Sequence, residues 1–333
     1  MPYTRREFTK LALTATPALG LLGSPLSAAG VSQVMPGSHI NGVQIGAITY
    51  SYRSMADQSA EATLKYVIDS GISAIELMGA PAESFAGRPA AGRGGGGGGR
   101  GGRGAQRTPE ELAAQRAAQQ AAQADLKAWR LSASMDRFKA LRTMYNNAGV
   151  SIYAVKILSP NMSDEEFEYV FDVAEALGCS HTTLELPGDE AQLKRIGEFA
   201  MKRKIYAAYH THLQGTMTAF DRAFELSPGN MANVDLGHYV AAGNIGGTPV
   251  EFLQKHHARI SSVHIKDRKS KENGGANVAW GTGDTPIREI LQAMKARAWK
   301  FPATVELEYP IPEGSDAVAE TKKCVEYCRA ALA

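Results

Sequence analysis

The sequence is poor in cysteine and nearly neutral in net charge. Cys324 and Cys328 stand four residues apart, which places them on one helix face without giving disulfide geometry by default. We therefore expect these two residues and Cys179, the three cysteines of the chain, to be small core residues. The net charge is +2, with 36 Lys and Arg against 34 Asp and Glu, so no electrostatic case for a nucleic-acid partner exists.

The first 29 residues predict an export signal. Residues 4–10 read Thr-Arg-Arg-Glu-Phe-Thr-Lys, a twin-arginine pattern, and an apolar stretch at 11–22 and small residues at 27–30 follow. The apolar stretch is too short to span a bilayer permanently, and no cysteine stands near the cleavage point to carry a lipid. We expect a soluble periplasmic or secreted protein that begins near Ala29 and has no stable membrane anchor. The alternative is a basic segment ahead of a first helix.

One internal tract lacks apolar side chains almost completely. Residues 88–107 consist mainly of Gly, Arg and Ala, a composition that cannot bury a core. Arg-Gly tracts bind RNA in some proteins. In an exported protein we instead expect a disordered surface insertion within a single domain that spans residues 40–333.

Outside this tract, short apolar segments alternate with amphipathic ones. We expect eight strands, at 42–50, 74–78, 150–157, 181–186 and 204–212, two that end at Asp235 and His264, and one at 304–308. Helices, several opened by Ser or Thr caps, stand between them. This alternation predicts an α/β fold, and a closed (β/α)8 TIM barrel is the natural count. A doubly wound sheet is the alternative, but the first strand–helix turn lacks its Gly-rich phosphate fingerprint.

Seven of the eight predicted strands end in ionisable residues. In a parallel barrel, catalytic groups lie at the C-terminal ends of the strands. The residues at these ends are Glu76, Lys156, Glu185, His210, His212, Asp235, His238, His264, Lys266, Asp267, Glu306 and Glu308. Packing alone does not explain so many charged strand ends, so we expect the active site at this face.

Two motifs contain the strongest candidates for metal ligands. Residues 233–238 (Asn-Val-Asp-Leu-Gly-His) and 262–267 (Ser-Val-His-Ile-Lys-Asp) are apolar runs that stop at ionisable side chains. The carboxylate of Asp235 and the imidazole of His264 suit a divalent ion such as Mn, Mg, Co or Zn. The structural alternatives are an Asx-type turn with a surface histidine at His238, and a satisfied core histidine at position 264.

Two further strand ends carry pairs of such residues. His210 and His212 alternate along one strand and so share a face, and one should point at the metal while the other points at the rim. We assign His210 to the metal and His212 to the substrate; a structural role for either is the alternative. Glu306 and Glu308 share a face in the same way, and burying both without a cation would be costly. Glu308 lies nearer the strand end and is the preferred ligand, with Glu306 as the alternative.

The remaining candidates are assigned to the substrate. Glu185 and Lys156 are candidates for general acid–base catalysis, since burial can raise the pKa of a glutamate and lower that of a lysine. The alternative is a salt bridge between the two. Lys266 is assigned to substrate binding. Trp280 lies in a Gly-rich loop and either stacks on a sugar ring or plugs the barrel.

At these residues the chain resembles the xylose-isomerase-like barrel superfamily, also called sugar phosphate isomerases/epimerases. The Asp-Leu-Gly-His and Val-His-Ile-Lys-Asp motifs are the most specific part of a resemblance that runs from Gly42 to the C-terminus, apart from the Gly/Arg tract. It implies one divalent ion held by residues of strands five to eight. Asp235 and His264 match the ligands of strands six and seven, and Glu308 or Glu306 matches that of strand eight. His238 matches a histidine that contacts substrate, and we count it among the catalytic residues.

The fifth strand departs from this resemblance. His210 stands where the family commonly has a glutamate, which removes a negative charge and a proton acceptor. Epimerisation by two bases thereby loses one base. Relatives that act as keto-glycoside lyases or hydratases need only one base and one acid.

The resemblance implies a divalent-metal-dependent isomerase or epimerase that removes a proton next to a metal-bound carbonyl of a sugar or keto-sugar. A keto-glycoside lyase or hydratase on the same barrel is the second hypothesis. An apurinic endonuclease would need more metal ligands and a basic surface, which the small net charge opposes. A non-catalytic sugar-binding barrel is the remaining class.

Overall fold

The computed structural model describes residues 36–89 and 108–333. The expected export signal at 1–29 and nearly all of the Gly/Arg tract at 88–107 lie outside the described residues. Within the described ranges, no helix is long and apolar enough to cross a membrane. Cys179, Cys324 and Cys328 are free thiols in the core, as predicted.

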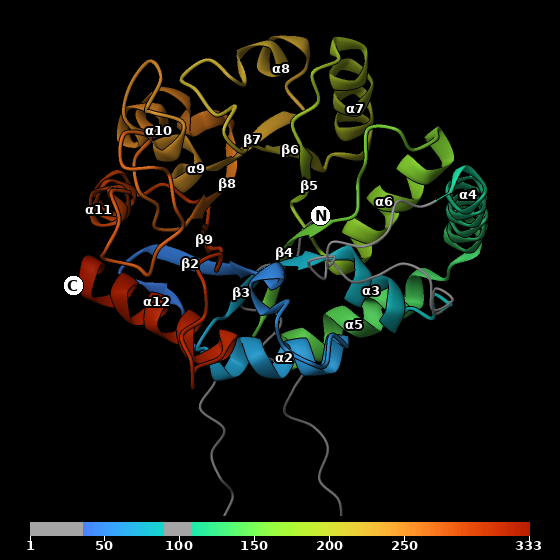
Figure 1. Cartoon of the computed structure of the whole chain (residues 1–333), viewed down its shortest axis with the longest axis horizontal. Helices are drawn as coiled ribbons and strands as arrows, with labels where there is room; N and C mark the ends of the chain where they lie inside the picture. The colour runs from blue at the N-terminus through green and yellow to red at the C-terminus, as the bar shows by residue number, and fades with distance from the viewer. Residues whose placement is uncertain (1–35, 90–107) are drawn as a thin grey trace, which may run out of the picture. The chain divides into compact units, whose positions relative to one another are not determined.

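Eight parallel strands close into a barrel at the centre of the fold (Figure 1). They are β2 (Val43–Ile48), β3 (Ala74–Met78), β4 (Ser151–Lys156), β5 (His181–Glu185), β6 (Tyr206–His210), β7 (Asn230–Asp235), β8 (Ile260–Ile265) and β9 (Ala303–Val305). The last strand pairs with β2 through Ile45 and Ala303, which closes the ring. A short strand, β1 (His39–Ile40), adds to β2 in antiparallel orientation. The predicted (β/α)8 TIM barrel is confirmed.

The helices surround the barrel, and their starts follow the caps in the sequence. They are α2 (Ala60–Asp69), α3 (Gly79–Phe85), α4 (Pro109–Ser132), α5 (Met135–Asn147), α6 (Asp164–Leu177), α7 (Glu190–Arg203), α8 (Asp221–Leu226), α9 (Leu236–Ala241), α10 (Pro249–His256), α11 (Ile287–Arg297) and α12 (Ala317–Leu332), with 3-10 turns η1 (Thr49–Tyr52) and η2 (His257–Arg259). Capping boxes open α4, α6 and α10 at Thr108, Ser163 and Thr248, as their sequences predict.

The helix α6 shows how sequence pattern becomes packing. Its apolar residues recur at helical spacing, so Phe167, Val170 and Phe171 are fully buried while its charged face remains in solvent. The helix ends at Gly178, whose φ of 76° is the left-handed conformation that glycine adopts most readily. The chain then turns directly into β5.

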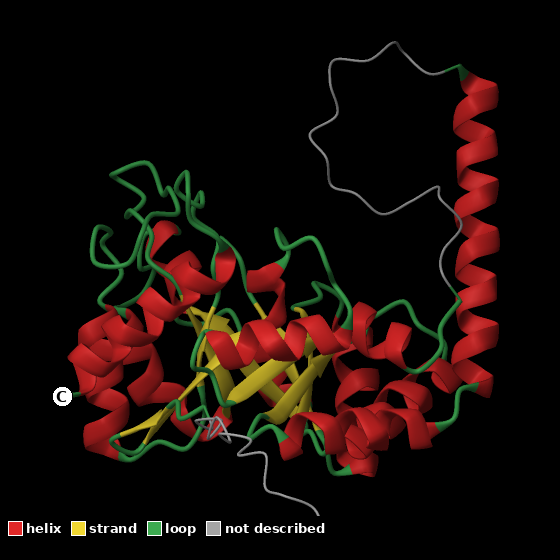
Figure 2. Ribbon diagram, turned by 90° about the horizontal axis from the view of Figure 1, so that it is seen from below, coloured by secondary structure: helices red, strands yellow, loops and turns green. Residues whose placement is uncertain are grey.

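The helix α4 stands out from the barrel and buries none of its residues (Figure 2). Its last turn is tied to the barrel by Arg130, which donates to the buried carboxylate of Glu83 at 2.8 Å. Arg88 lies 3.0 Å from the same carboxylate, and the Tyr169 hydroxyl lies 3.2 Å from it. Glu83 is thus a structural buried acid on an outer helix.

Candidate active site

Four side chains from neighbouring strands meet at the C-terminal end of the barrel. His210 ends β6, Asp235 ends β7, His264 lies on β8 and Glu306 directly follows β9. Their ligand atoms all lie within 4.8 Å of one another, and all four residues are buried. We call these four residues the metal cluster. It contains Glu306, whereas Glu308, the preferred ligand in the sequence analysis, lies outside it.

Strand register places these groups at one height. Asp235 is the register partner of His264 across β7 and β8, so their side chains leave neighbouring strands side by side. The N–H of Glu306 donates to the carbonyl of Ile265 at 3.2 Å, which continues the pairing of β9 with β8. Glu308 is two residues further along the chain and therefore lies nearer the rim.

The glycine of the Asp-Leu-Gly-His motif allows two segments to approach closely. A Cβ at Gly237 would lie 2.5 Å from Cγ of Lys266 and 2.7 Å from its carbonyl oxygen, so a larger residue would push away the segment that follows β8. Asp235 Oδ1 accepts the N–H of His238 at 2.6 Å and caps α9. The Asx-type turn considered as an alternative for Asp235 is therefore present. Oδ2 of Asp235 takes no part in this turn and faces the metal cluster.

Among the described residues, His210 Nδ1 is buried without a hydrogen-bond partner, and Asp235 Oδ2 has no hydrogen bond but lies 3.0 Å from the Lys266 ammonium. Burial holds the pKa of His210 well below its usual range, so its ring is neutral and has a free lone pair. Burial raises the pKa of Asp235, Lys266 opposes this shift, and Glu306 reinforces it. The unpaired His210 nitrogen and the carboxylate oxygen of Asp235, which already faces one cation, fit a metal ion, and two imidazoles with two carboxylates suit a divalent transition metal.

Lys266 lies among the carboxylates instead of facing an open substrate site. Its Nζ donates to Glu306 Oε2 at 2.9 Å and to Glu308 Oε2 at 2.5 Å, and lies 3.0 Å from Asp235 Oδ2. Burial alone would lower the pKa of Lys266, but these carboxylates outweigh burial and raise it. Lys266 therefore offsets part of the negative charge of the metal cluster. The sequence had suggested that Lys266 binds substrate.

Glu76 lies buried directly behind His264. Its Oε2 is 2.8 Å from His264 Nε2, and its Oε1 accepts the hydroxyl of Thr183 at 2.6 Å. On the other side of the ring, His264 Nδ1 lies 3.0 Å from Glu306. Burial opposes the charged ring, but the two carboxylates outweigh it and raise the pKa of His264 to about 10. In the sequence, Glu76 is one of the charged strand ends but is not one of the predicted site residues. Its signal was an acid inside the apolar run Ala-Ile-Glu-Leu-Met.

Lys156 and Glu185 form an ion pair on one side of the mouth. Lys156 Nζ lies 2.8 Å from Glu185 Oε1, so the salt bridge weighed in the sequence analysis is present. Burial would lower the pKa of Lys156, but Glu76 and Glu185 outweigh it and raise it, which contradicts the expected lowering. Lys156 is therefore an ammonium at neutral pH. Glu185 Oε2 also lies 3.8 Å from Nε2 of the exposed His212.

His238 lies in the first turn of α9, directly after β7. Its Nε2 is 3.8 Å from Glu308 Oε2, and its Nδ1 is in contact with Nη1 of Arg268. Burial, Lys266 and Arg268 together lower the pKa of His238 to about 2, so the ring is neutral. His210, His212 and His238 have ring nitrogens within 4.8 Å of one another, so these three histidines form a second group with the spacing of metal ligands. We call it the imidazole group. Arg268 did not emerge from the sequence analysis.

Asp267 organises the loop that follows β8. Its carboxylate accepts the N–H groups of Gly281 at 2.8 Å and Gly283 at 2.9 Å. Trp280, directly before Gly281, packs edge-on against Tyr327 of α12 with 5.8 Å between ring centroids. The ring thus packs on an outer helix, while stacking on a sugar and plugging the barrel both stay predictions for Trp280.

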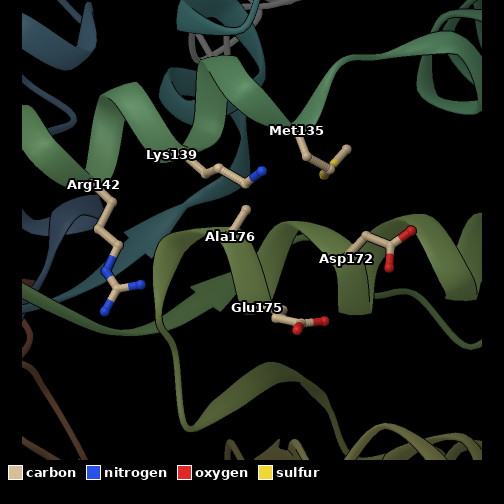
Figure 3. A pocket seen from close by; sticks show the side chains of 6 residues that line it. All are labelled: Met135, Lys139, Arg142, Asp172, Glu175 and Ala176. Atoms are coloured by element: carbon tan, nitrogen blue, oxygen red, sulfur yellow. The ribbon is translucent and has the colours of Figure 1, made fainter.

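A cavity of about 420 Å³ lies away from the barrel mouth, between α5 and α6 (Figure 3). It is lined by Met135, Lys139, Arg142, Asp172, Glu175 and Ala176. Two cations and two acids on the outer surface do not converge on one point, and no member of the metal cluster contributes. This cavity is therefore separate from the metal cluster.

Comparison with protein families agrees with this architecture. Residues 111–330 match the family described as xylose isomerase-like TIM barrel, and the chain belongs to that family. No curated protein matches the chain at a significant level.

Several solved structures share the fold. A sugar phosphate isomerase/epimerase from Parabacteroides distasonis is 18% identical, with 89% of this chain and 97% of that one covered and a TM-score of 0.55. A probable 3-DHS dehydratase involved in petrobactin synthesis in Bacillus anthracis is 15% identical over 85% and 98%, with a TM-score of 0.56. A D-allulose 3-epimerase from Methylomonas sp. is 14% identical over 87% and 98%, with a TM-score of 0.53. At these identities the likeness concerns the fold alone.

Proposed function

We propose that the protein is a divalent-metal-dependent carbohydrate isomerase or epimerase that moves a proton next to the carbonyl of a sugar or keto-sugar. The observation that carries this proposal is the buried metal cluster facing a rim that holds the Lys156–Glu185 pair. A divalent ion held by His210, Asp235, His264 and Glu306 would supply Lewis acidity toward a carbonyl and its neighbouring hydroxyl.

The residues of the rim divide the proton-transfer roles. The side chain of Glu185 is 50% exposed, so its carboxylate can reach a substrate carbon as a general base. The Lys156 ammonium, 2.8 Å away, stabilises the carboxylate and can donate a proton to a substrate oxygen. One carboxylate that removes a proton and returns it to the adjacent carbon is sufficient for isomerisation. Because His210 replaces the family's usual glutamate, this geometry favours one-base isomerisation over two-base epimerisation.

A lyase or hydratase is the second candidate, and the acid–base pair on one side of the mouth favours it. In the lyase direction, Glu185 would take the proton from the carbon beside the carbonyl. The electrons of that C–H bond would first pass to the carbonyl, and would then form a carbon–carbon double bond as the neighbouring C–O bond breaks. Lys156 would give its proton to the departing oxygen, so the step balances without an external reagent.

Incubation of the metal-loaded protein with sugars and keto-glycosides in deuterated water tests the proposal. We expect deuterium at one carbon beside the carbonyl of the true substrate, detected by NMR. Glu185→Gln should retain the metal and slow exchange by roughly 10²- to 10⁴-fold, the usual effect of losing a general base. No exchange and no turnover on any compound would instead favour a sugar-binding barrel.

The variant Lys156→Met separates the two candidates. An isomerase that uses Glu185 alone should keep most of its deuterium exchange in this variant. A lyase should lose elimination, because the departing oxygen no longer receives a proton. Loss of elimination with exchange preserved would identify the lyase.

A further inference from the structure

We propose that Arg268 is a positioning residue that fixes His238 in the neutral tautomer with its hydrogen on Nε2, which makes His238 a hydrogen-bond donor to a substrate oxygen. The substrate contact rests on the proposed function. The tautomer depends only on the contacts of the protein itself, so the two can be tested separately.

The contact between Arg268 Nη1 and His238 Nδ1 determines where the hydrogen lies. A guanidinium has only donors and stays charged in proteins. The imidazole nitrogen that faces it must therefore accept, and an accepting nitrogen carries no hydrogen. A neutral imidazole has one N–H group, so the hydrogen of His238 is on Nε2.

Arg268 is itself held in place by the loop after β8. Its Nε donates to the carbonyl of Gly275 at 3.0 Å, and Nη2 also reaches this oxygen. Its backbone N–H donates to the hydroxyl of Thr285 at 3.1 Å, and its backbone pairs with Asn277 in an antiparallel bridge. The guanidinium is thus oriented before any substrate binds.

The Nε2 side of His238 faces the mouth. Glu308 Oε2 lies 3.8 Å away, beyond hydrogen-bond range, and this oxygen is already bonded to Lys266 at 2.5 Å. The ring lies 4.8 Å from that of His212, measured between centroids. An N–H group next to the metal cluster and not taken by Glu308 suits a hydroxyl or carbonyl oxygen of a carbohydrate.

The same contact rules out two other roles for His238. A general base needs a free lone pair facing the substrate, and the only lone pair of His238 faces Arg268. A metal ligand needs the same, so the imidazole group of His210, His212 and His238 does not hold a second ion despite its spacing. We therefore expect about one divalent ion per chain, not two.

Long-range 1H–15N NMR of the 15N-histidine-labelled, Zn²⁺-loaded chain near neutral pH tests the tautomer. The His238 signals are assigned by their loss in His238→Asn. We expect a protonated Nε2 and an unprotonated Nδ1 in the wild type, and a mixture of both tautomers in Arg268→Met. The control is Arg53→Met, which removes an arginine whose hydrogen bonds go to the carbonyls of Tyr50 and Leu307, and it should leave the His238 signals unchanged.

The wild-type spectrum decides the question even if Arg268→Met does not fold, since a hydrogen on Nδ1 would overturn the proposal. Zn²⁺ titration is a second test. Two bound ions per chain in the wild type, falling to one in His212→Ala, would also overturn the proposed tautomer. If a substrate is found, Arg268→Met should lower kcat/KM by roughly tenfold, the effect of one weakened hydrogen bond. Adding this change to His238→Asn should have no further effect. A correct tautomer without any turnover would refute the proposed function and leave this inference standing.

Discussion

Asp235→Asn should remove the divalent ion and, with it, turnover. His264→Gln should have the same two effects. Each change takes one of four donors from a buried site, and the remaining donors are already partly neutralised by Lys266. The loss in metal affinity should exceed the roughly 10- to 100-fold that follows from losing a supporting partner of a ligand. Elemental analysis of the dialysed variants measures the ion, and deuterium exchange measures the chemistry.

The two glutamates after β9 provide the matched comparison for this experiment. Glu306 belongs to the metal cluster, whereas Glu308 is bonded to Lys266 and is partly exposed. We expect Glu306→Gln to lose the ion and Glu308→Gln to retain it. A full equivalent of metal in the Asp235 and His264 variants would refute the site. Loss of metal in Glu308→Gln alone would return the ligand role to Glu308.

The barrel and three of the four cluster residues could be predicted because they depend on periodicity. Alternation along a strand and the common direction of parallel strands place His210, Asp235 and His264 at one face without any knowledge of distances. The choice between Glu306 and Glu308 could not be made in this way, since both share one face. It depends on how high β9 stands relative to β8, which the barrel stagger sets.

The charges of the site could not be predicted because they depend on neighbours in space. Burial lowers the pKa of Lys156, but two carboxylates outweigh this effect and raise it. They are Glu185 and Glu76, and Glu76 stands eighty residues earlier in the chain. The contact of Arg268 with His238 likewise depends on the loop after β8, which Asp267 holds by accepting the N–H of Gly281. Sequence patterns identify which groups reach the mouth and suggested the Lys156–Glu185 pair, but they do not show how Glu76, Lys266 and Arg268 pair with their neighbours.

The buried carboxylate of Glu76 leads to the last prediction. In the metal-loaded protein, Glu76 can accept the Nε2–H of His264 at 2.8 Å and so orient the ring for the ion. Glu76→Gln should lower the affinity for the divalent ion by roughly 10- to 100-fold, because the amide weakens this support without removing a ligand. Competition with a metal-binding dye measures the change.

The same variant should change how the stability of the metal-free protein depends on pH. The pKa of His264 is raised from 6.5 to about 10, so the charged ring stabilises the folded state fully below pH 6.5 and this contribution is lost as the pH rises toward 10. Glu76→Gln removes one of the two carboxylates that raise this pKa. The free energy of unfolding should therefore be lower than wild type near pH 6 and should fall less between pH 6 and pH 9, as measured by urea unfolding in a chelator.

Glu83→Gln is the control for this experiment, because Glu83 is also a buried acid but pairs with Arg88 and Arg130 on the outer side of the barrel. Arginine side chains carry a charge at every pH used here, so the variant should lose a similar amount of stability at pH 6 and pH 9 and keep the metal affinity of the wild type. Equal metal affinities in the two variants, or parallel pH profiles, would show that Glu76 only fills the barrel interior and does not support His264.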